Sequence, residues 1–144
     1  MSVSTISAFE TTIHKTNVWL KDLLMELGWE NESHERAFHT LRTVLHALRD
    51  RLGVNESNDL ASQLPMLIRG FYYETWIPEK TPVKERHREQ FLEHIMDAFG
   101  NHDIVDAERI VRGVFRVLRK HISVGEINDV RHALPESIRQ LFDD

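Results

Sequence analysis

The sequence predicts an all-α protein in which about eight helices form one compact bundle of two similar four-helix halves. Three observations lead to this prediction. Apolar residues recur at helical spacing, no segment alternates apolar and polar residues as a strand does, and the second half repeats the first. A chain of 144 residues suits one domain. We therefore expect a single domain, residues 1–144, made of repeat halves 1–76 and 77–144.

The repeat is the strongest signal. Residues 41–72 align without a gap on residues 111–142, and 12 of these 32 positions are identical. A weaker match, shifted by two residues, places residues 19–28 over residues 91–100. Such similarity within one chain indicates an internal duplication. The identical pairs are Arg42/Arg112, Val44/Val114, Leu48/Leu118, Arg49/Arg119, Val54/Val124, Glu56/Glu126, Asn58/Asn128, Asp59/Asp129, Leu64/Leu134, Pro65/Pro135, Ile68/Ile138 and Arg69/Arg139.

The long helices follow from apolar periodicity. The first is expected to carry Phe9 and Ile13 on the same apolar face as the leucines of residues 20–27, and to end at Gly28, a left-handed stop. The second helix and its copy carry matching stripes, expected to be core. These are Ala37, Leu41, Val44, Leu45, Leu48 and Leu52, and Ala107, Val111, Val114, Phe115, Leu118 and Ile122.

The remaining helices are short. Asn55 and Gly125 stand at the expected N-caps of the third helix in each half. Pro65 and Pro135 fit the first turn of the fourth helix in each half, where the missing proline N–H removes no hydrogen bond.

The segment Thr75–Pro82 joins the halves. Its prolines, Pro78 and Pro82, favour extended backbone. Because it is short and contains Trp76, we interpret it as a strap lying on the core rather than a flexible linker. Further helix starts are expected at Thr81-Pro82 and at Asp103 with Asp106.

The composition disfavours several classes of function. A formal net charge of −5 argues against a general nucleic-acid binder, and the absence of cysteine excludes disulfides and thiol chemistry. The sequence shows neither a signal peptide nor a run of about 20 apolar residues, so we expect a cytoplasmic protein that contacts no membrane. It also lacks a nucleophile elbow, a phosphate-binding Gly-rich loop and a zinc-protease motif. We expect no catalytic residue and no cofactor.

Because the chain has no cysteine, the imidazoles of its nine histidines are the main nitrogen or sulfur ligands left for a metal ion. His39 and His46, like His87 and His94, are seven residues apart, or about 10 Å along a helix. Two such residues are too far apart to share one ion, whose imidazole ligands lie about 2.0–2.1 Å away. We therefore predict no metal site.

Charged residues recur in both halves. In each half, arginines lie at the border of the apolar stripe. Carboxylates that also recur in both halves are the expected ion-pair partners of these arginines. We favour structural ion pairs between the two sets, with an anion-binding site as the alternative. A basic stripe on the sixth helix is interpreted as a solvated face rather than a nucleic-acid surface. The three sets are Arg42, Arg49, Arg112 and Arg119; Glu56, Asp59, Glu126 and Asp129; and Arg109, Arg112, Arg116 and Arg119.

The first half ends in an aromatic run. Phe71 and Tyr72 match apolar positions of the second half and are expected to be core. Tyr73 and Trp76 have no counterparts and follow Arg69 closely. They either close the seam between the halves or line an interface or pocket.

Two segments carry a family resemblance, LRDRL at residues 48–52 and DLASQLPMLIRGFYYETW at residues 59–76. With nearly the whole chain, they resemble a bacterial family of uncharacterised proteins, domain of unknown function 2267. The resemblance implies a small bacterial all-helical protein and implies no activity, cofactor or catalytic residue. Ser62 and Thr75 stand where the family pattern favours small residues such as Ala and Gly, departures not expected to change the fold.

Two functional hypotheses follow. The first is a non-enzymatic cytoplasmic interaction or scaffold module that binds a protein partner or a second copy of itself. The alternative is a small-molecule or anion-binding protein, or an enzyme, with an Arg/His pocket between the halves. The candidate interaction or anion site comprises Arg49, Arg69, Tyr73, Trp76, Arg119 and Arg139.

Overall fold

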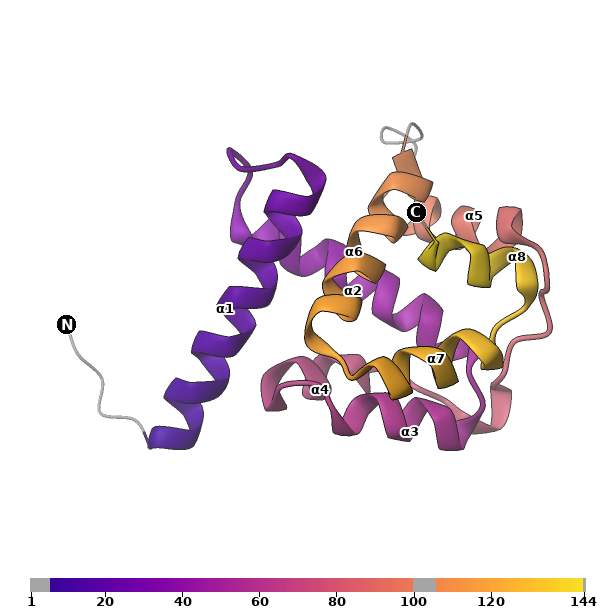
Figure 1. Ribbon diagram of the computed structural model, residues 1–144, viewed down its shortest axis with the longest axis horizontal. Helices are drawn as coiled ribbons and strands as arrows, with labels where there is room; N and C mark the ends of the chain where they lie inside the picture. Colours follow the sequence, from indigo (N-terminus) through magenta and orange to yellow (C-terminus); the bar gives the residue numbers. More distant parts are fainter. Residues whose placement is uncertain (1–5, 100–105, 144) are drawn as a thin grey trace.

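A computed structural model describes residues 6–99 and 106–143. Across these residues the regular secondary structure is entirely helical, which confirms the predicted all-α class (Figure 1). The α-helices are α1 (Ser7–Leu27), α2 (His34–Arg51), α3 (Val54–Ser62), α4 (Met66–Tyr72), α5 (Arg88–Phe99), α6 (Ala107–His121), α7 (Val124–Ala133) and α8 (Glu136–Arg139). The 3-10 turns are η1 (Pro78–Lys80) and η3 (Gln140–Phe142).

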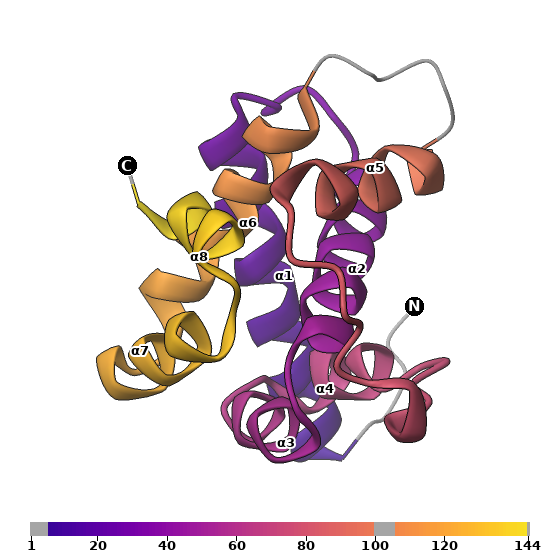
Figure 2. The ribbon, with the colours of Figure 1, turned by 90° about the vertical axis from the view of Figure 1, so that its right-hand side faces the viewer.

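The helices of the two halves make equivalent contacts. Helices α2 and α6 touch each other, and both α1 and α5 lie against this pair. Helix α4 packs on α1 and α2, as α8 and η3 together pack on α5 and α6, and α3 meets α7. Figure 2 shows α3 and α4 below α2, with α7 and α8 beside α6. The two halves thus share an arrangement of helices, and the internal duplication itself stays a prediction from the sequence.

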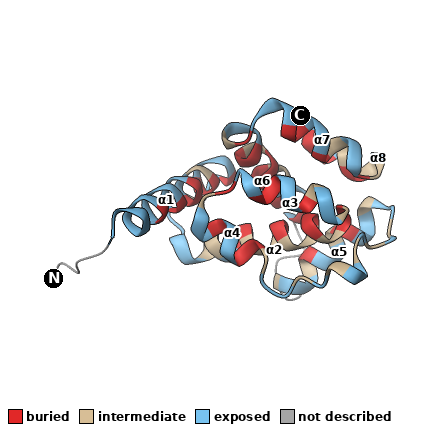
Figure 3. Ribbon diagram, turned by 90° about the horizontal axis from the view of Figure 1, so that it is seen from below, coloured by how far each residue is buried: buried red, intermediate tan, exposed pale blue. Residues whose placement is uncertain are grey.

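The predicted apolar stripes of α2 and α6 form the centre of the core. Leu41, Val44, Val111 and Phe115 are completely buried. Figure 3 shows this buried surface on the inward faces of the helices, with the outward faces exposed. The amphipathic spacing of the two long repeats therefore selects the buried face correctly.

Helix α1 divides into a buried and a projecting part. From Thr16 onward it packs into the core, whereas its N-terminal turns extend beyond it (Figure 3). Phe9 and Ile13, predicted to share the apolar face of this helix with its leucines, are 50% and 49% exposed. In the repeat alignment Thr16 corresponds to Arg88, the first residue of α5. The earlier turns of α1 thus have no helical equivalent in the second half, and only their Thr12 side is covered, where the Leu67 N–H of α4 donates to the Thr12 hydroxyl at 2.9 Å.

The helix boundaries depart slightly from prediction. Gly28 ends α1 in the left-handed conformation at a φ of 69°, as predicted. The N-caps of α3 and α7 are Gly53 and Ser123, two residues before the predicted caps. The Ser123 hydroxyl accepts a hydrogen bond from the backbone N–H of Glu126, because a serine oxygen satisfies an open helix N–H better than a glycine at position 125 could. Pro65 and Pro135 occupy N-caps rather than the first turns.

The strap between the halves is longer than predicted. Helix α5 begins at Arg88, so the helix start expected at Thr81-Pro82 is wrong. The Val83 N–H donates to the Asp50 carbonyl at 2.7 Å, and Glu85 pairs with Arg51 at 3.3 Å. These contacts hold the segment extended along α2, where apolar periodicity is too sparse to favour a helix. Asp106 is the N-cap of α6, and position 103 lies outside the described residues.

Within the described ranges, no helix is long and apolar enough to cross a membrane.

Candidate functional site

The duplicated arginines at positions 69 and 139 bind the ends of helices. Arg69 donates to the backbone carbonyls of Ala61 and Leu64, at 2.9 and 3.0 Å, where α3 ends. Arg139 makes the equivalent bond to the Leu134 carbonyl at 3.1 Å, after α7. A guanidinium at a helix C-terminus pairs with open carbonyls and with the negative end of the helix dipole. Both residues therefore fix the turn between two short helices.

Arg49 and Arg119 bind the next helix end in each half. Arg49 is 2% exposed and donates to the carbonyls of Tyr72 and Glu74, at 2.8 and 2.6 Å. Arg119 donates to the Phe142 carbonyl at 2.9 Å. The four arginines nominated as a candidate site thus lie at four helix ends, those of α3, α4, α7 and η3.

The expected pairing of repeated arginines with repeated carboxylates is wrong. Arg42 pairs with Glu74 at 3.0 Å, and Arg49 pairs with Asp50 at 2.9 Å. Helix dipoles and open carbonyls recruit the guanidinium groups instead. The carboxylates repeated at positions 56, 59, 126 and 129 are left on α3 and α7, which meet each other.

The basic stripe of α6 is engaged within the molecule. Arg109 donates to the Leu27 carbonyl at 2.6 Å, and Arg116 pairs with Glu26 at 2.8 Å. Arg112 bonds to the Glu108 carboxylate at 3.2 Å. The stripe therefore serves to attach α1 and to brace α6.

Tyr73 and Trp76 form a half-buried aromatic pair beside α3. Their ring centroids are 5.3 Å apart, and the Tyr73 hydroxyl donates to the Asn58 side chain at 2.6 Å. The Trp76 Nε1 atom is shielded from solvent and has no hydrogen-bond partner among the described residues. The preceding residues Phe71 and Tyr72, expected to be core, are buried.

A cleft of about 890 Å³ lies between the start of α1 and the turn from α3 to α4. His14, Lys15, Arg69 and His121 are among its lining residues. The His121 ring stacks on Trp19, with centroids 4.7 Å apart. His121 is the one lining residue from the second half of the chain; the others belong to the first half.

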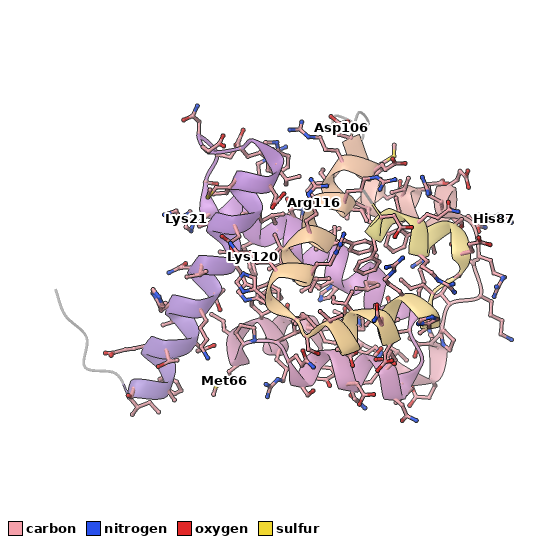
Figure 4. All side chains as sticks on the ribbon, viewed as in Figure 1. Lys21, Met66, His87, Asp106, Arg116 and Lys120 are labelled. Carbon is pink, nitrogen blue, oxygen red and sulfur yellow. The ribbon has the colours of Figure 1, made fainter. Side chains whose placement is uncertain are left out.

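Asp22 supports the imidazole of His121. His121 contacts the Asp22 carboxylate at 2.7 Å, and Lys120 donates to it at 3.0 Å. Burial opposes ionisation of this carboxyl, but the hydrogen bonds from His121 and Lys120 prevail and lower its pKa. Figure 4 shows Lys120 on α6 on the side toward α1.

An apolar groove of about 640 Å³, which the sequence did not nominate, lies between α1 and α4. Its apolar walls come from both helices and from Phe38 of α2, and Glu74 stands at its edge. Figure 4 shows Met66 at the end of α4 nearest the projecting turns of α1. The lining residues are Phe9, Thr12, Thr16, Phe38, Met66, Leu67, Gly70, Phe71 and Glu74.

The surface around this groove is unusually apolar. Phe9, Ile13, Met66 and Leu67 are each about half exposed, at 50%, 49%, 54% and 46%. The alignment of the two halves already sets this surface apart. Residues 66 and 67 of the first half are apolar, whereas their equivalents in the second half are the polar pair Glu136-Ser137. A duplicated position that is apolar in one copy only indicates a surface with its own role.

Comparison with known proteins gives a family but no activity. The family model described as Uncharacterized conserved protein (DUF2267) matches residues 16–141. No curated protein matches the chain. The matched segment begins where α1 enters the core and continues to η3. Because it covers most of the sequence, this chain belongs to the DUF2267 family of uncharacterised conserved proteins.

Proposed function

We propose that this protein is a non-enzymatic interaction module that associates with a second copy of itself through the surface shared by α1 and α4. The observation that carries the proposal is the apolar surface of Phe9, Met66 and Leu67, which line the groove, together with the exposed Ile13 one helical turn after Phe9. Half-exposed apolar side chains gathered at one place mark contact surfaces more often than scattered ones do.

The shape of this surface favours a second copy as the occupant. The projecting turns of α1 form a ridge, and the groove against α4 lies directly beside it. A twofold axis could place the ridge of each copy in the groove of the other, as an isologous interface requires. The projecting turns also precede the residues that match the family model.

The contact should be weak. Covering a half-exposed apolar side chain contributes roughly 1 kcal/mol, so the eight from the two copies exceed the freedom lost on association by only about 4–5 kcal/mol. We expect a dissociation constant of about 0.1–1 mM. Sedimentation velocity from about 5 to about 500 μM should show a concentration-dependent change from monomer to dimer.

Matched charge insertions test the surface. Phe9→Glu and Leu67→Glu place a carboxylate in the proposed contact and should abolish the dimer. Val124→Glu is the control, since Val124 is an exposed apolar residue at the start of α7. A wild-type chain that stays monomeric throughout, or Glu variants that dimerise as the control does, would contradict the proposal. Circular dichroism confirms that each variant keeps its helices.

The aromatic pair nominated by the sequence is the competing contact. Tyr73→Ala and Trp76→Ala should leave the dimer intact if the contact lies between α1 and α4. If these two variants alone abolish association, the interface lies beside α3 instead.

Binding of an anion or small molecule is the second candidate function. The cleft lined by His14, Lys15, Arg69 and His121 gathers cationic and imidazole groups at one place, His121 from the second half and the others from the first. Calorimetric titration with inorganic phosphate at low salt should detect binding, and Lys15→Ala should weaken it at least threefold. Absence of heat at about 10 mM phosphate would exclude this function.

A further inference from the structure

A cluster of carboxylates lies where α3 meets α7, away from the apolar groove. Glu56 and Asp59 occupy the same positions on α3 that Glu126 and Asp129 occupy on α7. Because these helices touch, the repeat brings its own acidic residues together. Carboxylate oxygens of Glu56, Glu126 and Asp129 all lie within 4.8 Å of one another.

Two of these oxygens are buried without a partner. Glu126 is only 8% exposed. The Oε2 atoms of Glu56 and Glu126 are shielded from solvent and lack a hydrogen-bond partner among the described residues. An unpaired buried carboxylate oxygen costs free energy that a structure normally recovers from a donor or a cation. These two buried oxygens without a hydrogen-bond partner distinguish the site from an acidic patch whose carboxylates are solvated.

The surroundings intensify this need for positive charge. Burial, then the Glu56 carboxyl, then the charges of Asp59 and Asp129, raise the pKa of Glu126 to about 8. The repeated arginines that could have neutralised the cluster bind helix ends instead. A cation bound among these carboxylates would supply the positive charge that the arginines do not.

We infer that Glu56, Glu126 and Asp129 form a binding site for a hard divalent cation at the contact between α3 and α7. Only oxygen donors are present, which suits Ca²⁺, Mg²⁺ or Mn²⁺ rather than softer metals. Oxygens up to 4.8 Å apart can lie on opposite sides of an ion at Ca²⁺–oxygen distances of about 2.3–2.6 Å. Mg²⁺ demands near-ideal octahedral geometry and gives up its water reluctantly, so three carboxylates on two helices suit it less well. Ca²⁺ is therefore the expected ion, and the exposed side of Asp129 leaves room for water ligands.

Calorimetric titration of the full chain with CaCl₂, after removal of metals with EDTA, tests the site. We expect saturable binding of one Ca²⁺ per chain. Mg²⁺ should bind at least tenfold more weakly.

Glu126→Gln keeps the shape of the side chain and removes its charge, so it should weaken Ca²⁺ binding at least tenfold. Glu30→Gln is the control, since Glu30 is exposed in the turn before α2, at the far end of α2 from α3. Asp129→Asn, at an exposed position, should weaken binding at least threefold and covers the case in which Glu126→Gln unfolds. Absence of binding to Ca²⁺, Mg²⁺ and Mn²⁺ at about 10 mM would overturn the site. Wild-type affinity in both the Glu126→Gln and the Asp129→Asn variants would also overturn it. In either case the carboxylates would share a proton instead of a cation.

Discussion

Thr75 carries the clearest single-residue strain in the described part of the chain. It adopts a φ of 62°, in the left-handed region that β-branched residues rarely enter. It also stands where the family resemblance expects a small residue such as Gly. The departure leaves the helices in place, but the backbone shows why a glycine would suit this position.

Thr75→Gly should therefore stabilise the protein. Relief of the left-handed strain outweighs the extra freedom that glycine gives the unfolded chain, by roughly 0.5–1 kcal/mol. Urea unfolding followed by circular dichroism measures the change. Thr75→Ala keeps the Cβ atom and is the control. Equal or lower stability of the Gly variant would show that the turn does not store this strain.

Glu126 makes stability depend on pH in metal-free buffer. Its folded pKa is raised from 4.5 to about 8, so the folded state holds a proton that the unfolded state has lost. The resulting stability is complete below about pH 4.5 and is lost as the pH rises through about 8. Glu126→Gln has no proton to lose at this position, so its free energy of unfolding should decline less over that range.

Urea titrations in EDTA from about pH 5 to about pH 9 measure both curves. Parallel curves would show that Glu126 titrates normally. The sequence marked this glutamate as a repeated residue but assigned it an arginine partner. Only the packing of α3 on α7 shows that its neighbours are other carboxylates.

At the scale of elements, the short helices depend on arginines for their ends. Arg69→Ala removes charge-assisted bonds to the Ala61 and Leu64 carbonyls and leaves them unpaired. We expect a loss of about 2–3 kcal/mol in the free energy of unfolding. Arg69→Lys should recover only part of it, because an ammonium cannot reproduce the planar fork.

Arg139→Ala should lose a similar amount, since it makes the equivalent bonds. Arg86→Ala, at an exposed position on the strap, should change stability by less than about 0.5 kcal/mol. Thermal and urea denaturation of the set measure these differences. If all the arginine variants behave like Arg86→Ala, the caps contribute nothing and the repeated arginines are free for another role.

Helix α1 shows where periodicity fails as a guide to burial. The apolar face continues from Leu27 back to Phe9, so the sequence treats it as one core stripe. Periodicity reports which face of a helix is apolar but not whether a neighbour covers it. The missing information came from the structure, in which α5 begins at the equivalent of Thr16 and the earlier turns of α1 have no counterpart.

At the scale of the whole molecule, neither half has a complete core. Leu23 and Leu27 of α1 approach Gly113 of α6, where an added Cβ would lie 2.5 Å from a Leu27 methyl group. Helix α5 likewise lies against α2. Residues 1–76 expressed alone would expose these surfaces.

We therefore expect residues 1–76 to show weak helicity and no cooperative thermal transition, whereas the full chain melts cooperatively. Circular dichroism of both measures this. A cooperative transition of the isolated half would show that the chain consists of two domains rather than the single one predicted.

The sequence by itself determined the helical class, the family and the buried faces of α2 and α6, because these follow from local spacing and from repetition within the chain. The tertiary structure decided which carbonyls the arginines bind, which carboxylates meet, and which apolar turns of α1 remain uncovered. Charges and apolar faces select partners across distances that spacing along a chain does not encode. Those partners depend on how the two halves pack against each other.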